Sequence, residues 1–394
     1  MSWKCFVVLS FVGVLVIVRP SEAWFEQCSH NINLNAGSSM YINSPGYPGR
    51  YPSGSSCRYV ITAPIDQEIN VQCSIALDKG ANSCGTEYFY VSTEGDTDLT
   101  DSEYFCGSGY VQRKSLFRTV TIAYTSSSTS AGGSFSCLVQ SNPQPCDCGW
   151  STTTRIVGGT EAQVNEFPLM AAIIYIPQRL PFCGATIISH RALVTAAHCF
   201  GNYNTATQLA ALVGEHDMKT GAETRYTALH PVQSIRVHEY YDPSTNQNDI
   251  ALVFTQTNIE WSRGVGPACL PFLYSYATFD GLDVEIAGWG TTSYGGPTST
   301  VLMKATTTVA SNSNCQSVIS GLTSSQMCTY SPPQDSCQYD SGGPLIRRFQ
   351  RLFIVGIISY GQGCGATAPA VNTRVTSYLD WIQNNVGETL CRKN

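Results

Sequence analysis

Cysteine is the residue type that most constrains how this chain can fold. There are 17 cysteines in 394 residues, spread over the whole length. Cys5 lies in segment 1–23, where a lysine, an apolar stretch over 5–18 and small residues before position 24 are typical of a secretory signal peptide. Without Cys5, sixteen cysteines remain. An even number in an exported chain predicts disulfides, up to eight of them.

The alternatives to an exported, disulfide-bonded protein fit the sequence less well. A membrane anchor needs a longer apolar run than 5–18. A zinc site needs two close pairs of ligands, and Cys146 and Cys148 have no such partner pair. The net charge of −6 and the absence of a lysine or arginine cluster argue against a nucleic acid or a membrane surface as partner.

The chain is long enough for two or three domains, and its character changes near residue 140. Segment 24–138 has short alternating runs separated by Gly/Pro turns and no helical period, which predicts an all-β sandwich. Segment 139–155 is polar and turn-rich, as expected of a linker and activation segment. Segment 156–394 is predicted to be largely β, with one helix over 375–386 that turns Tyr378, Trp381 and Ile382 to one face.

Three residues of this last segment stand in contexts that suit acyl transfer by serine. His198 follows small residues and precedes Cys199, which can be tethered to Cys183. Asp249 heads an apolar run, where a carboxylate would be partly buried and could orient a histidine. Ser341 is followed by two glycines, which permit a tight turn that exposes its hydroxyl. Each context alone has an ordinary structural explanation, but a nucleophile, a base and an orienting acid together do not.

In the order His, Asp, Ser, these contexts resemble the trypsin/chymotrypsin family of serine proteases over residues 156–386. The resemblance implies a double β-barrel with His198 as general base, Asp249 as the residue that orients it and Ser341 as nucleophile. It also implies an oxyanion hole formed by the backbone N–H groups of Tyr339 and Ser341. The substrates would be proteins or peptides.

The same resemblance implies a zymogen. Arg155 and Ile156 begin a run, Arg-Ile-Val-Gly-Gly, that is similar to the activation site of the family. An activating protease would cleave after Arg155, and the new amino group of Ile156 would pair with Asp340. A buried ion pair that exists only after cleavage is suited to act as a switch.

Substrate preference is implied by Asp335, six residues before the nucleophile. In trypsin-like members an acid at this position pairs with Arg or Lys of the substrate, and a buried carboxylate demands such a cation. Ser359 and Gly361 would lie on the pocket wall. Two departures from the family are Tyr339 and Ala370, each at a usual glycine position; they leave open a narrowed pocket with unusual specificity and weaker binding of bulky inhibitors.

The remaining expectations from this resemblance concern disulfides and calcium. The pairs implied are Cys183–Cys199, Cys315–Cys328 and Cys337–Cys364. Cys269 would bind either Cys146 or Cys148, leaving the other for Cys391, and the sequence does not choose between them. Glu215 and Glu223 flank a loop that binds calcium in some members, although two acids in a loop are more often solvated; no metal or cofactor is expected otherwise.

Segment 24–138 resembles a CUB domain through Ser44-Pro45-Gly46, the aromatic run 88–91 and Phe105-Cys106-Gly107. The resemblance implies the pairs Cys28–Cys57 and Cys84–Cys106, with Cys73–Cys137 as an additional bridge. Asp78 matches one acid of the calcium site found in many such domains. Phe89 and the serines of 126–130 were expected to replace the others, so no calcium is predicted there. The domain would bind a protein or glycan partner or act as a spacer.

Two function classes follow. The first is a secreted, extracellular serine endopeptidase, similar in its domain pairing to arthropod proteases of venom and haemolymph. The second is a non-catalytic binding protein on a protease scaffold, in which the CUB domain does the work. The intact positions His198, Asp249 and Ser341 favour the endopeptidase.

Overall fold

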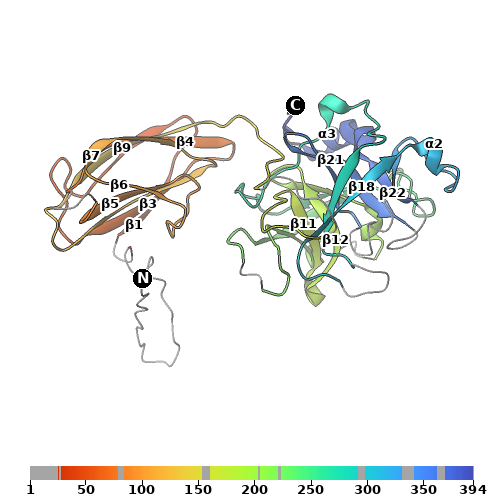
Figure 1. Ribbon diagram of the computed structural model, residues 1–394, viewed down its shortest axis with the longest axis horizontal. Helices are drawn as coiled ribbons and strands as arrows, with labels where there is room; N and C mark the ends of the chain where they lie inside the picture. Colours follow the sequence, from red (N-terminus) through yellow and green to blue (C-terminus); the bar gives the residue numbers. More distant parts are fainter. Residues whose placement is uncertain are drawn as a thin grey trace, which may run out of the picture. The chain divides into compact units, whose positions relative to one another are not determined.

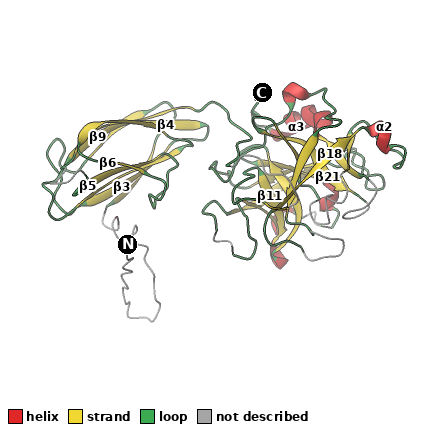
Figure 2. Cartoon of the chain, in the orientation of Figure 1, coloured by secondary structure: helices red, strands yellow, loops and turns green. Residues whose placement is uncertain are grey.

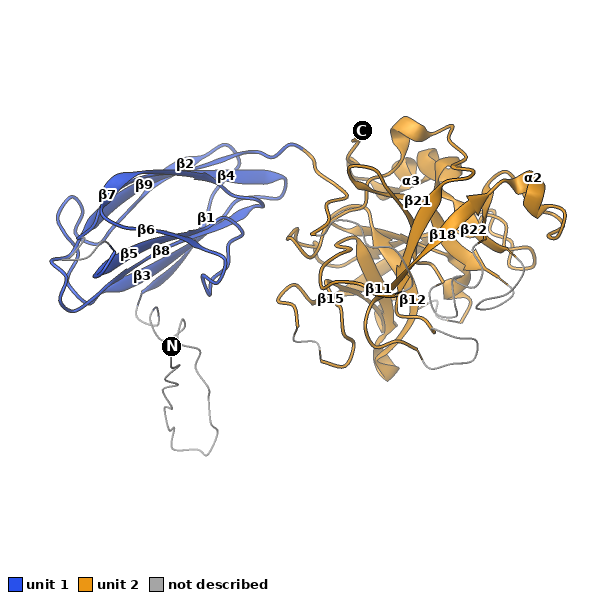
Figure 3. Ribbon diagram, viewed as in Figure 1, with its two compact units in different colours: residues 1–145 blue, residues 146–394 orange. Residues whose placement is uncertain are grey.

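The chain divides into two compact units, residues 1–145 and 146–394, in a computed structural model (Figures 1 and 3). Strands dominate both units, and the helices are short (Figure 2). The structure describes residues 25, 28–78, 84–152, 160–202, 205–220, 223–291, 298–330, 341–361 and 369–393. No helix within these ranges is long and apolar enough to cross a membrane.

The N-terminal unit is a β-sandwich. One sheet has the strand order β1 (Ser29–Asn33), β3 (Ser56–Thr62), β8 (Thr119–Ser126), β5 (Glu87–Ser92), β6 (Glu103–Phe105). The other has the order β2 (Ser39–Asn43), β9 (Ser134–Pro143), β4 (Gln67–Ala76), β7 (Ser108–Lys114). Alternate residues of these strands point inwards, so Ile69, Val71 and Phe89 are fully buried between the sheets. The predicted sandwich is confirmed.

The last strand of this sandwich extends beyond the predicted domain boundary. We expected the domain to end at residue 138, but β9 continues to Pro143 and pairs with β4 along its whole length, from Gln67↔Pro143 to Ala76↔Ser134. The polar residues after 138 face a partner strand rather than solvent alone. The polar composition of residues 139–143 suggested a linker, but backbone pairing makes these residues part of the sheet.

The C-terminal unit consists of two β-barrels. The first is closed in the order β11 (Met170–Tyr175), β12 (Leu180–Ile187), β13 (Ala192–Thr195), β16 (Ala251–Thr255), β15 (Ala228–Val237), β14 (Leu209–Val213). The second has the order β18 (Met303–Ala310), β17 (Asp283–Gly288), β20 (Pro344–Arg348), β21 (Leu352–Tyr360), β22 (Ala370–Arg374), β19 (Gln326–Tyr330), and β18–β19 pairing closes it. The short strand β10 (Thr160–Glu161) pairs with β18. The predicted double barrel is confirmed.

Helices are few in this unit. They are α2 (Asn312–Cys315), α3 (Leu379–Val386) and the 3₁₀ turns η1 (Ile176–Gln178), η2 (Ala197–Phe200), η3 (Ala206–Gln208), η4 (Phe272–Tyr274), η5 (Val375–Tyr378). The helix expected over 375–386 is thus η5 followed by α3. Ile382 is fully buried and Tyr378 nearly so, as expected, but Trp381 is half-buried and Leu379 packs into the core instead.

The segment that follows the sandwich is fixed to the C-terminal unit. Cys148 forms a disulfide with Cys269, and Gly149 exchanges backbone hydrogen bonds with Pro267 and Leu352. The indole N–H of Trp150 donates to the carbonyl of Ser262. A methyl group on Gly266 would come within 1.8 Å of the Trp150 ring, so only glycine leaves room for this indole. Residues 148–150 therefore belong structurally to the barrels.

Candidate active site

His198 and Asp249 are brought together by strand pairing in the first barrel. β13 ends at Thr195, which pairs with Ala251 at the start of β16. His198 lies in the 3₁₀ turn just after β13, and Asp249 lies just before β16. Because the two strands are antiparallel, the end of one lies beside the beginning of the other. Two residues 51 positions apart thus become neighbours.

The carboxylate of Asp249 is held from several sides. Oδ2 lies 2.7 Å from Nδ1 of His198, and Oδ1 accepts the backbone N–H of His198 at 2.9 Å. The hydroxyl of Ser359 donates to Oδ2 at 2.5 Å. The Asp249 side chain has 0% exposure, whereas that of His198 has 27%. A buried carboxylate with fixed donors is suited to hold the imidazole in one tautomer and to stabilise its protonated form.

Ser341 stands where the second barrel meets the first. Its carbonyl accepts the N–H of Gly184 in β12, and the next residue, Gly342, donates its N–H to Ile358 in β21. Gly342 has φ +79°, and a Cβ on it would lie 2.1 Å from the hydroxyl oxygen of Thr195. Both the positive φ and the lack of space for a Cβ therefore require glycine at this position. The backbone of Ser341 is thereby anchored against the end of β13, the strand that precedes His198.

Two supporting residues come from the second barrel. We expected Ser359 on the wall of the substrate pocket, but its hydroxyl is directed to Asp249. Thr373 was not singled out from the sequence; its hydroxyl donates to the carbonyl of Asp249 at 2.6 Å. No local signal marks either residue, since each acts on a group more than 100 positions away. Both belong to strands, where alternate side chains point to opposite faces.

Several expected residues lie outside the described part of the chain. They are Arg155, Ile156, Asp335, Cys337, Tyr339, Asp340 and Cys364. Of the expected pocket wall, Ala370 is buried in β22, and a Cβ on Gly361 would lie 3.4 Å from the Ala370 methyl. Gly361 and Ala370 are thus close neighbours.

The disulfides of the described residues include the choice that the sequence left open. They are Cys28–Cys57, Cys73–Cys137, Cys84–Cys106, Cys146–Cys391, Cys148–Cys269, Cys183–Cys199 and Cys315–Cys328. Cys148, rather than Cys146, bonds to Cys269. The reason is the backbone pairing of Gly149 with Pro267 and Leu352, which places Cys148 beside Cys269.

Glu215 and Glu223 lie together, as their flanking positions suggested. Burial raises the pKa of Glu215 to about 7, and a hydrogen bond to Glu223 contributes in the same direction. Although burial opposes it, hydrogen bonds from the Thr220 hydroxyl and the Asp217 N–H hold the pKa of Glu223 well below its usual range. The pair therefore shares one proton near neutral pH, carried by Glu215.

We expect Glu215→Gln to change how stability depends on pH. Folded Glu215 keeps its proton up to about pH 7, whereas glutamate in an unfolded chain loses it near pH 4.3. Stability therefore falls as the pH rises between these values, because only the unfolded chain releases the proton. Glutamine cannot ionise, so the melting temperature of the variant relative to wild type should be higher at about pH 8 than at about pH 5.

The control for this prediction is Glu388→Gln, which changes a glutamate of the C-terminal tail. Melting curves are recorded with a chelator present and again with added calcium. The proton-sharing account is contradicted if the two variants give the same pH profile. It is also contradicted if the profile of Glu215→Gln departs from wild type only when calcium is added.

The sandwich has its own buried acid, which the sequence interpretation missed. Phe89, expected at an acid position, lies in the core. Glu87, two residues earlier on the same strand, has 0% exposure and accepts hydrogen bonds from Ser130 Oγ at 2.6 Å and the Asp78 N–H at 2.7 Å. Asp78 in turn accepts the N–H of Ala131 at 2.9 Å. An acid at the head of an aromatic strand, two residues from Phe89, was the available signal.

Known proteins agree with this architecture. The model of the trypsin family matches residues 156–382, and the model of the CUB domain matches residues 28–138. Venom serine protease 34 of Apis mellifera is 38% identical over 388 residues, covering 95% of this chain and 92% of that protein. A venom serine protease of Polistes dominula is 38% identical over 263 residues, covering 65% of this chain and 94% of that protein. The proclotting enzyme of Tachypleus tridentatus is 32% identical over 263 residues, covering 62% of this chain and 69% of that protein. The chain therefore belongs to the trypsin family of serine proteases and is a trypsin-like serine endopeptidase that carries a CUB domain.

Proposed function

We propose that this chain is the precursor of a secreted endopeptidase that is activated by cleavage after Arg155 and cuts peptide bonds after Arg or Lys. The observation that carries the catalytic part is the hydrogen bond between His198 Nδ1 and the buried carboxylate of Asp249, beside the anchored turn of Ser341. Secretion is supported by the signal-like segment 1–23 and by the disulfides of both units.

The proposed reaction is acyl transfer through Ser341. Its hydroxyl attacks the carbonyl carbon of the scissile bond while Nε2 of His198 takes the proton. Asp249 accepts the Nδ1–H of His198 and stabilises the imidazolium that forms. The backbone N–H groups of Ser341 and Tyr339 stabilise the oxyanion. His198 then gives the proton to the leaving amine. In the second half of the reaction water takes the place of the attacking hydroxyl: His198 accepts its proton, and Ser341 is the leaving group that receives the proton back.

Specificity and activation rest on the expected roles of charged residues. Asp335 would bind the cationic side chain of the substrate, and Ala370, next to Gly361, would narrow the same pocket by a methyl group. Asp340 would receive the amino group of Ile156 after cleavage. The CUB domain would bind a protein or glycan partner that places the enzyme near its substrate. The relatives from bee, wasp and horseshoe crab are consistent with an arthropod protease of venom or haemolymph.

Covalent labelling tests the catalytic proposal. After cleavage at Arg155, a phosphonate probe should label the wild-type chain, and Ser341→Ala should take up no label. Chromogenic peptides ending in Arg or Lys should be hydrolysed far faster than peptides ending in Leu or Phe, because a buried acid rejects an uncharged partner. Correctly cleaved wild-type protein that takes up no label would instead support the non-catalytic binding protein.

We expect the CUB domain to stay attached after activation through two disulfides. Cleavage after Arg155 leaves Cys146 and Cys148 on the N-terminal fragment, whereas Cys391 and Cys269 lie on the other. The activated protein should therefore run as one species on a non-reducing gel and as two on a reducing gel.

Two double variants and one quadruple variant separate the contributions of the two bonds. Cys146→Ser/Cys391→Ser and Cys148→Ser/Cys269→Ser should each keep the fragments linked, because one disulfide is sufficient. Only the combination of all four substitutions should separate the two fragments on a non-reducing denaturing gel, because no disulfide then joins them. Release after removal of one pair alone would show that the other bond does not form.

A further inference from the structure

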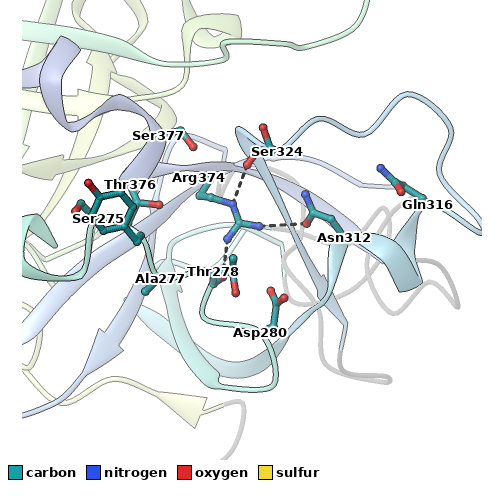
Figure 4. Close-up of a pocket in the computed structure, with 11 residues that line it drawn as sticks. Ser275, Ala277, Thr278, Asp280, Asn312, Gln316, Ser324, Arg374, Thr376 and Ser377 are labelled. Atoms are coloured by element: carbon teal, nitrogen blue, oxygen red, sulfur yellow. Dashed lines mark hydrogen bonds between the residues drawn. The ribbon is translucent and has the colours of Figure 1, made fainter.

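A hollow of about 360 Å³ lies in the second barrel, apart from the catalytic residues. The residues that line it are Ser275, Tyr276, Ala277, Thr278, Asp280, Asn312, Gln316, Ser324, Arg374, Thr376 and Ser377. They come from the segment after η4, from α2 and the residue after it, from the turn before β19, from the end of β22 and from η5 (Figure 4). Thr373, the preceding residue of β22, points to Asp249, so Arg374 faces away from it.

The side chain of Arg374 lies at the base of the hollow, where it is held in place by hydrogen bonds and carries a positive charge. Its guanidinium donates to the carbonyls of Ser324 and Thr278 and to Oδ1 of Asn312, at 2.5 to 3.2 Å (Figure 4). A fourth hydrogen bond reaches the carbonyl of Gln326. All of these acceptors are neutral, and the residue is only 6% exposed. The side chain is therefore fixed in place while its charge is not cancelled by a carboxylate in contact.

Asp280 supplies a negative charge to the hollow without forming an ion pair with the guanidinium of Arg374. Its carboxylate is directed toward the guanidinium (Figure 4). Among the contacts of the described residues, no ion pair links Asp280 to Arg374. Burial lowers the pKa of Arg374, and the charge of Asp280 offsets part of that change. A donor-only group and an acceptor-only group thus face the same space.

The rest of the lining includes several hydroxyl groups, the amides of Asn312 and Gln316, the methyl group of Ala277 and one aromatic ring. Thr376 is half-buried and Ser377 is exposed at the mouth. Within the described part of the chain, neither hydroxyl is hydrogen-bonded to another protein group. Tyr276 is 98% exposed, which leaves a whole aromatic face available. Such a ring can cover the C–H face of a ligand while polar groups bind its edge.

These features select one ligand chemistry. An anion would be attracted by Arg374 but repelled by Asp280. A cation would be attracted by Asp280 but repelled by Arg374. A hydroxyl group satisfies both, because it accepts from the guanidinium and donates to the carboxylate. We propose that this hollow binds a neutral saccharide unit, with one ring hydroxyl between the remaining N–H of Arg374 and the carboxylate of Asp280 and one face of the sugar on Tyr276. The volume is of the size found for small-ligand sites, which begin near 300 Å³.

The experiment uses the full-length chain carrying Ser341→Ala, so that it does not digest itself. Saturation-transfer NMR is measured with methyl α-mannoside, methyl β-galactoside, methyl N-acetyl-β-glucosaminide and methyl β-glucuronide, and sulfate, which has no hydrogen atoms to observe, is added as a competitor. At least one neutral glycoside should give transfer that a second neutral glycoside can compete away. Sulfate and the glucuronide should not compete. A site that takes only the charged probes, or none of the five, overturns the proposal.

Variants then locate the binding. Tyr276→Ala and Asp280→Ala change exposed residues, and each should weaken glycoside binding about tenfold or more through loss of the platform or of a charged hydrogen bond. Ser377→Trp should close the mouth and abolish binding. Tyr240→Ala is the matched control, because Tyr240 is a 74% exposed tyrosine of the same unit outside this hollow. Binding that survives all three pocket variants lies elsewhere, such as on the sandwich, and overturns the proposal.

Peptidase activity keeps the two proposals distinguishable. With Ser341 restored, the Tyr276, Asp280 and Ser377 variants should hydrolyse short peptides at the wild-type rate, because none of these residues contacts the catalytic groups. Loss of glycoside binding with full peptidase activity is the expected combination. An inactive wild-type enzyme that still binds the glycoside would contradict the proposed catalysis alone.

Discussion

Asp249→Asn is expected to lower kcat by about 10⁴-fold, the size of loss that the same change produces in a chymotrypsin-type triad. The wild-type carboxylate accepts from both the N–H and Nδ1 of His198, and from Ser359. An amide would present an NH₂ group to one of these donors, so His198 would be held in the wrong tautomer. KM should change little, because Asp249 is buried away from substrate. Steady-state kinetics with an Arg peptide measure both constants.

Asp242→Asn is the matched control for Asp249→Asn. Asp242 lies in the same connection between β15 and β16, where its carboxylate accepts from Ser244 and Thr245 rather than from His198. The control should keep nearly full activity. Ser359→Ala should lie between the two, because it removes one donor to Asp249 and leaves His198 correctly oriented. Equal activity of Asp249→Asn and Asp242→Asn would exclude the proposed role of Asp249.

Lys304→Met is expected to destabilise the C-terminal unit by about 3 kcal/mol or more, the range found when one partner of a buried ion pair is removed. Nζ of Lys304 lies 2.6 and 2.8 Å from the two carboxylate oxygens of Glu166, and both residues are less than 10% exposed. After the substitution Glu166 would keep, among the residues that the structure describes, only Arg348, at 3.9 Å, as a cationic neighbour. The carboxylate would then be buried without a close counter-charge. Denaturant titration of the unit, followed by tryptophan fluorescence, measures the loss.

The double variant Lys304→Met/Glu166→Gln separates the charge effect from packing. It removes the stranded carboxylate but keeps a side-chain oxygen for the N–H of Gln163. Most of the lost stability should return. Arg351→Met is the control in the same unit: Arg351 pairs with Asp147 at 2.8 Å, but the two side chains are 32% and 39% exposed, so the change should cost less than about 1 kcal/mol. A double variant as unstable as the single one would show that packing, rather than charge, is the cause.

The buried pair also bears on activation. Lys304 pairs through its backbone with Thr160 of β10, which lies four residues after Ile156. Glu166 accepts at its carbonyl from the Ser151 hydroxyl, on the other side of the proposed cleavage site. The pair thus holds the described segments on both sides of the site against the second barrel. A weakened pair should therefore slow activation as well as lower stability.

The alternating runs and the chemical motifs were readable from local sequence. Strands β3, β5 and β21 lie where apolar alternation or apolar runs placed them, because a strand signals itself within a few residues. Small residues around His198 and glycines after Ser341 likewise express local requirements. The domain end expected at 138 coincides with the end of the match to the CUB model, but the sheet itself continues to Pro143, because the pairing of β9 with β4 depends on a partner some 70 residues away, to which composition is blind.

The cysteines show the same division between what local sequence determines and what tertiary structure determines. The expectation that they form disulfides follows from the sequence alone. The choice of Cys148 for Cys269 does not, because it depends on the backbone of Gly149 lying between Pro267 and Leu352. Ser359 and Thr373 at Asp249, and the facing charges of Arg374 and Asp280, are also products of barrel closure. Sequence determined which local conformations and reactive groups were available, and tertiary structure decided which distant groups meet, because that choice is made by backbone pairing between strands far apart in the chain.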